Sequence, residues 1–85
     1  MPLDNFTIHG TEAGTDKTLD LDEISLLASP DTLQSLGEFF IESAKKMKTD
    51  DMDHIHLQDA LKTFSHGKHV DIILLNNTII KPNKT

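Results

Sequence analysis

Residues 53–57 read Asp-His-Ile-His-Leu, and this stretch decides the expected fold. Successive side chains of an extended strand point to opposite faces, so His54 and His56 share one face while Ile55 and Leu57 share the other. The alternation predicts a half-buried strand. Its polar face suits a metal ion, a protein partner or plain water, and the residues alone do not choose among these.

The segment before this strand predicts a long amphipathic helix over residues 30–48. Ser29 supplies a capping hydroxyl, Pro30 takes the first helical position, where no N–H is needed, and Asp31 places a carboxylate near the positive end of the helix dipole. Apolar residues then recur at helical spacing. A polar turn at residues 49–51 is expected to end the helix.

The amino-terminal third predicts two strands. Residues 6–9 alternate apolar and polar side chains, and residues 10–18 are rich enough in Gly, Thr and Asp to form a connecting loop. Residues 19–28 also alternate, but the phase shifts by one residue near Asp22 and Glu23. That shift predicts a bulge inside the second strand.

The carboxyl-terminal third predicts a further strand. Residues 58–68 form a connection that allows a helical turn, and residues 70–75 are apolar on both faces. A strand covered on both faces is typical of the centre of a sheet. The chain is then expected either to form a brief strand at residues 78–80 or to fray from Asn76 onward.

The succession of two strands, a helix and two strands predicts an α+β fold of type ββαββ, in which one helix packs on a four-stranded, largely antiparallel sheet. The 85 residues are expected to form a single small domain over residues 1–85, with an ordered core at about residues 4–76. A frayed carboxyl-terminal tail would lie outside that core.

One helix covers only one face of such a sheet. Ile73 and Leu75, together with Leu26 or Leu27, would lie on the uncovered face. A small monomer seldom exposes an apolar patch of that kind. The sequence therefore predicts that Ile73 and Leu75 belong to a homodimer or partner face.

Composition limits the class of protein. The chain has no cysteine, which removes disulfides and thiolate metal sites and fits a reducing compartment. No apolar run approaches the roughly 18 residues that a membrane span requires, and residues 1–5 lack the basic region of a secretory signal. We expect a cytoplasmic protein without membrane contact.

The negative charge is concentrated at the amino-terminal end. The formal net charge is -6, and residues 1–31 carry seven acidic side chains against Lys17. The chain also has no arginine, so binding to nucleic acid is not expected. Asp20, Asp22 and Glu23 would instead attract a basic protein surface, such as the DNA-binding cleft of a nuclease, with ordinary solubility as the simpler alternative.

Chemical motifs are few. His54 and His56 have the spacing of paired strand ligands, and Asp53 or Asp20 would complete a zinc site if the fold brought one near. Two surface histidines are the simpler alternative, so no cofactor is expected, with zinc left open. The adjacent serine and histidine at 65–66 lack a nucleophile elbow, and no phosphate-binding loop is present. An enzyme is therefore not expected.

One resemblance adds to these patterns. The leucine-rich helix, the Asp-His-Ile-His-Leu strand at 53–57, the Phe-Ser-His-Gly loop at 64–67 and the apolar strand at 70–75 resemble the immunity protein 32 family of bacterial polymorphic-toxin systems, over residues 21–75. The loop at Lys68 and His69 is more basic than that family leads us to expect.

The resemblance implies a small bacterial protein that binds a cognate toxin and blocks it without catalysis. Asp53, His54 and His56 would then form part of the docking face, and the acidic residues at 16–23 would aid the encounter. The alternative hypothesis is a homodimeric accessory protein that binds a metal through His54 and His56.

Overall fold

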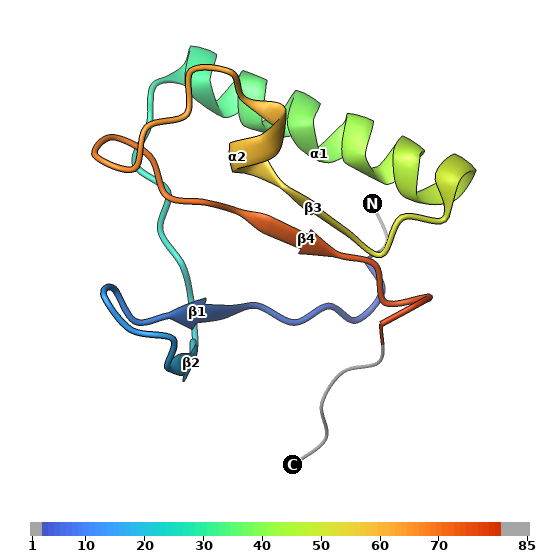
Figure 1. Cartoon of the computed structure of the whole chain (residues 1–85), viewed down its shortest axis with the longest axis horizontal. Helices are drawn as coiled ribbons and strands as arrows, with labels where there is room; N and C mark the ends of the chain where they lie inside the picture. The colour runs from blue at the N-terminus through green and yellow to red at the C-terminus, as the bar shows by residue number, and fades with distance from the viewer. Residues whose placement is uncertain (1–2, 81–85) are drawn as a thin grey trace.

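The computed structural model describes residues 3–80 and contains four short strands and two helices (Figure 1). In chain order these elements are β1 (His9–Thr11), β2 (Thr18–Asp20), α1 (Pro30–Asp50), β3 (His54–His56), α2 (Leu57–Ala60) and β4 (Ile73–Leu75). β1 pairs with β2 and β3 pairs with β4, both antiparallel, and the two pairs are separate sheets.

The expected four-stranded sheet of a ββαββ fold is therefore wrong. β1 and β2 close on each other through a turn in which the Glu12 N–H donates to the Lys17 carbonyl (2.9 Å) and Gly14 adopts a left-handed φ of 80°. β1 and β2 pair with each other through backbone hydrogen bonds within this hairpin. No strand pairing joins them to β3 or β4. The chain is α+β only in the loose sense that helix and strands are both present.

The bounds of the predicted strands also differ. The first strand begins at His9 and not at Phe6, and the second ends at Asp20. Residues 21–29, where a bulged strand was expected, form neither helix nor strand. Within residues 3–80, β4 pairs with β3 alone, so the predicted central strand at 70–75 is an edge strand of three residues there.

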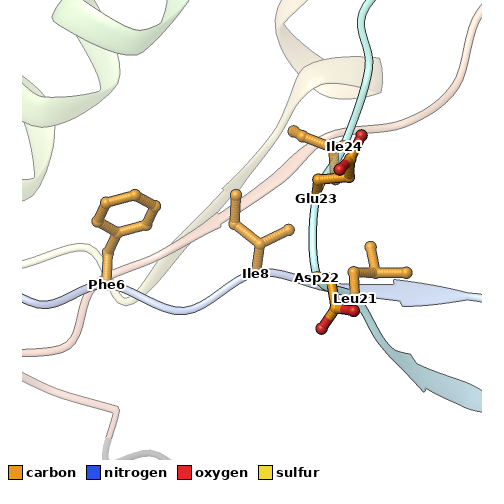
Figure 2. Close-up of a pocket in the computed structure, with 6 residues that line it drawn as sticks. All are labelled: Phe6, Ile8, Leu21, Asp22, Glu23 and Ile24. Carbon is orange, nitrogen blue, oxygen red and sulfur yellow. The ribbon is translucent and has the colours of Figure 1, made fainter.

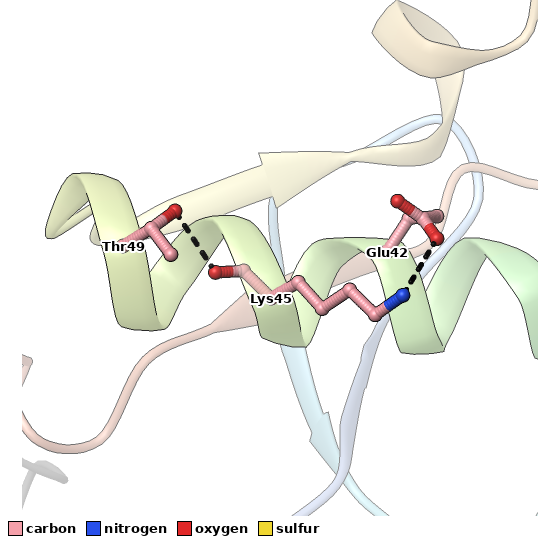
Figure 3. A network of polar contacts seen from close by, with 3 residues as sticks. All are labelled: Glu42, Lys45 and Thr49. Carbon is pink, nitrogen blue, oxygen red and sulfur yellow. Dashed lines mark hydrogen bonds and ion pairs between the residues drawn. The ribbon is translucent and has the colours of Figure 1, made fainter.

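α1 begins where the sequence predicts. Ser29 Oγ accepts the Thr32 backbone N–H (3.1 Å), and Pro30 occupies the first turn. The helix continues two residues past the expected end, to Asp50, before Asp51 turns the chain in the left-handed region (φ 52°). Near this end the Thr49 hydroxyl donates to the Lys45 carbonyl (3.1 Å), which ties the last turn together (Figure 3).

The β3–β4 pair is extended by backbone hydrogen bonds beyond the strands. The Leu57 N–H donates to the Ile72 carbonyl (2.8 Å), and the Asn76 N–H donates to the Asp53 carbonyl (2.9 Å). Residues 76–80 then form a turn around the Asn76 carbonyl, so no strand forms at 78–80. The part of the expected frayed tail at 81–85 lies outside the described residues.

The interior of the molecule is small. Among the described residues Leu57, 7% exposed, is the buried apolar side chain, and Ser43 is the buried polar one. The chain exposes 7788 Å², whereas a folded monomer of 9.5 kDa exposes about 5000 Å². The Cα radius of gyration is 13.8 Å, against about 12 Å for a compact chain of this length. Among the described residues, fifteen large apolar side chains are exposed.

The molecule has two parts, which we call the arm (residues 3–28) and the helix–strand unit (residues 30–80). In Figure 1, α1 runs along one side of the β3–β4 pair, and the arm hairpin lies on the other side. No hydrogen bond within the described part of the chain joins the arm to the unit. Residues 3–80 contain no helix long and apolar enough to cross a membrane.

Candidate functional site

The exposed face of the β3–β4 pair carries the two histidines that the sequence singles out. The register sets His54 opposite Leu75 and His56 opposite Ile73. Directly opposed residues project from the same face of a sheet, so two imidazoles lie beside two aliphatic side chains. The imidazole centroids are 5.3 Å apart, with the rings inclined at 78°. We call these four residues the histidine face.

Each imidazole of this face contacts a carboxylate through the same ring nitrogen. His54 Nδ1 lies 2.7 Å from Asp53 Oδ1, and His56 Nδ1 lies 2.8 Å from Asp71 Oδ2. A carboxylate accepts hydrogen bonds, so Nδ1 carries the proton in both rings. In the neutral form of such a ring, Nε2 is the nitrogen that can accept a hydrogen bond or bind a metal ion.

Asp71 is the functional residue that the sequence analysis missed. Its Oδ1 accepts the Gln58 backbone N–H (2.9 Å) while its Oδ2 holds His56, so one carboxylate joins β3 to the first turn of α2. Burial raises the pKa of Asp71, but hydrogen bonds from His56 and Gln58 outweigh it and hold the pKa below its ordinary value. The available signal was an acidic residue inside the apolar run at 70–75.

A surface cavity adjoins the histidines, between the end of α1 and β3. Its lining residues include His54, His56, Lys46 and the acidic residues Asp50, Asp51 and Asp59. The acidic residues outnumber the lysine, which favours a cation over an anion at the entrance. Within residues 3–80, however, no group of three or more His, Asp or Glu side chains is placed to hold a metal ion.

Neither carboxylate that was expected to complete a metal site is placed as a third ligand beside the two histidines. Asp53 is bound to His54, and Asp20 lies in β2 opposite His9. Ile73 and Leu75, expected at a homodimer or partner face, are each 49% exposed on the histidine face. Leu26 and Leu27 are also exposed, but they belong to the arm.

The arm has a cavity of its own, of about 170 Å³ (Figure 2). Its apolar lining comes from two stretches of the arm that meet there, and Asp22 and Glu23 line it as well. The apolar lining residues are Phe6, Ile8, Leu21 and Ile24. The predicted partner-binding residues are therefore divided between two places: Asp20, Asp22 and Glu23 in the arm, and Asp53, His54 and His56 in the helix–strand unit.

The loop at residues 64–69 holds itself together through its histidines. The Ser65 backbone N–H donates to His69 Nδ1 (2.9 Å), and the Phe64 ring contacts the His66 ring edge-on at 4.9 Å. Within the described residues no hydrogen bond joins the Ser65 hydroxyl to an imidazole. The geometry that activates a serine nucleophile is not present in this loop.

Comparison of the chain with protein-family models, with curated proteins and with solved structures found no match in any of the three. The resemblance to the immunity protein 32 family stays a prediction from the residues.

Proposed function

We propose that this chain is a non-catalytic binding protein of the cytoplasm whose arm binds a basic protein surface. The observation that carries this proposal is the combination of exposed apolar side chains and negative charge in the arm. Phe6, Ile8 and Ile24 are exposed there. The same 26 residues hold six acidic side chains against Lys17.

Exposed apolar surface supports a protein as the occupant. The large apolar side chains of the arm that are exposed are Leu3, Phe6, Ile8, Leu21, Ile24, Leu26 and Leu27. An exposed apolar patch on a small protein commonly marks a surface that binds another protein. The arm cavity, at about 170 Å³, is smaller than the pockets of about 300–1000 Å³ that usually hold a small ligand.

Charge supports a basic partner. Acidic residues around an apolar centre speed the encounter with a positive surface and oppose binding to acidic proteins. Toxin neutralisation is the specific form of this function that the resemblance implies. In that form the arm would bind across the basic, nucleic-acid-binding cleft of a nuclease toxin and exclude its substrate.

The test uses the protein encoded by the gene next to this one, because toxin and immunity genes are expected to be neighbours. Its binding to the chain would be measured by stopped-flow kinetics at low and high salt. We expect Asp20→Asn, Asp22→Asn and Glu23→Gln together to slow association roughly tenfold at low salt. The matched control removes the same charge from the helix–strand unit, with Glu38→Gln, Glu42→Gln and Asp59→Asn.

The control should leave association nearly unchanged. Equal slowing by both triple variants would show a general effect of net charge and would contradict a role for the arm. Failure of the wild-type chain to bind the neighbouring gene product would contradict the toxin-neutralising form.

A further inference from the structure

The histidine face points to a second kind of binding, which does not depend on the partner of the arm. We propose that His54 and His56 from two copies of this chain bind one divalent transition-metal ion, with zinc as the best fit. The two copies are related by a two-fold axis that passes through the histidine face.

Each ring makes the carboxylate contact that is typical of a histidine that binds a metal ion. In metal sites a ligating imidazole usually donates its other N–H to a carboxylate, which fixes the ring and makes the ligating nitrogen more basic. Asp53 and Asp71 make this contact with His54 and His56 at 2.7 and 2.8 Å. Both contacts are made through Nδ1, so Nε2 is the ligating atom in each case.

The number of ligands requires a second copy. Zinc in structural sites takes four ligands in a tetrahedron, and the described part of one chain brings together two free imidazole nitrogens without a third ligand. In a two-fold dimer the same patch of both subunits meets itself. Two histidine faces opposed in this way supply four nitrogens to one ion.

The surroundings of the histidines favour a second copy as the occupant. Ile73 and Leu75 flank the imidazoles and are half-exposed, so they would pack around the two-fold axis. A small monomer seldom leaves adjacent large apolar side chains exposed unless another surface covers them, and a two-fold dimer covers Ile73 and Leu75 of both copies at once.

The negative charge of the chain explains why two copies need a metal ion between them. Each chain has a formal net charge of -6, and Asp50, Asp51 and Asp59 line the cavity beside the histidines. Two such surfaces repel each other, and burying four Nε2 atoms without partners would be costly. A dication on the two-fold axis offsets the repulsion and satisfies the free nitrogens at once.

Native mass spectrometry of the untagged, metal-stripped chain, before and after addition of zinc alone, tests the proposal. We expect zinc to convert monomer into a dimer that retains one ion. His54→Ala should weaken zinc-dependent dimerisation more than about tenfold, and Asp53→Asn should weaken it by about tenfold. The matched control is His9→Ala, which removes a histidine of the arm. It should leave both the zinc-dependent dimer and its affinity for zinc unchanged.

His56→Ala also removes the contact to Asp71, so His54→Ala and Asp53→Asn are the decisive variants for a folded protein. One zinc ion on a monomer would overturn the shared site. A dimer of the same stability without zinc, or zinc binding that survives His54→Ala, would overturn the metal site. The Asp20, Asp22 and Glu23 variant should keep zinc-dependent dimerisation, so failure of the arm proposal and failure of this one are distinguishable.

Discussion

The arm and the helix–strand unit differ in how far apart in the sequence their hydrogen-bonded residues lie. In the unit, hydrogen bonds connect distant parts of the chain: Asp71 bonds to His56 and to Gln58, and Asn76 bonds to residues 52 and 53. In the arm the bonds stay within one hairpin, such as the 2.9 Å bond between Glu12 and Lys17. β3, α2 and β4 are thus tied together by long-range hydrogen bonds, whereas the hydrogen bonds of the arm are local.

Apolar side chains show a smaller difference. Leu57 of the unit is buried and no apolar side chain of the arm is, but the unit also leaves side chains such as Phe40, Ile41 and Val70 exposed. A segment without long-range hydrogen bonds and with few buried contacts opens at little cost in free energy. We infer that the free energy of unfolding of the chain comes mainly from the unit. The exposed apolar side chains of the arm are then covered by a partner protein.

The largest expected effect breaks the unit. Leu57→Ala removes the buried apolar side chain, and such substitutions cost about 2–5 kcal/mol in the free energy of unfolding. Leu27→Ala is the matched control in the arm and should change that free energy by less than about 0.5 kcal/mol. Urea unfolding followed by helix circular dichroism measures both. Equal losses would show that the arm belongs to the folded core.

An intermediate effect tests the contact between β3 and α2. Asp71→Asn replaces a carboxylate that holds both His56 and the Gln58 N–H, and we expect a loss of about 1–3 kcal/mol, as for hydrogen bonds to charged groups. Glu38→Gln, on the exposed surface of α1, is the control and should be neutral. An unchanged urea midpoint for Asp71→Asn would show that the Asp71 carboxylate does not stabilise the contact between β3 and α2.

The smallest effect compares two glycines. Gly37 lies inside α1 with open space around it, so Gly37→Ala should stabilise the unit by about 0.5–1 kcal/mol. Gly14 has a φ of 80° in the arm turn, so Gly14→Ala strains the hairpin by about 1–2 kcal/mol. Because the arm is local, urea unfolding of the unit should respond to Gly37→Ala alone. A lower urea midpoint of the unit in Gly14→Ala would show that the arm and the unit unfold together.

Local signals in the sequence predicted the local structure. The Ser29 cap and Pro30 define the start of α1 through groups within one helical turn. The alternation at residues 53–57 predicted β3, because side-chain direction in a strand depends on neighbours alone. Ile73 and Leu75 are exposed, but the reason given for it, a helix that covers one face of a four-stranded sheet, does not hold.

Pairing between strands was not predictable in the same way. Strands of three residues carry little pattern, and whether β2 joins β1 alone or a larger sheet depends on contacts far apart in the sequence. Asp71 was missed for the same reason, since its contact with His56 spans 15 residues. The division of the predicted site residues between arm and unit follows from these long-range contacts.

Hydrogen–deuterium exchange of the free chain, read by mass spectrometry at peptide resolution, tests the central claim most directly. The account predicts that amides of α1, β3 and β4 exchange slowly and that amides of β1 and β2 exchange almost as fast as an unfolded peptide. Slow exchange of β1 and β2 at the same level as β3 and β4, without any partner, would contradict it.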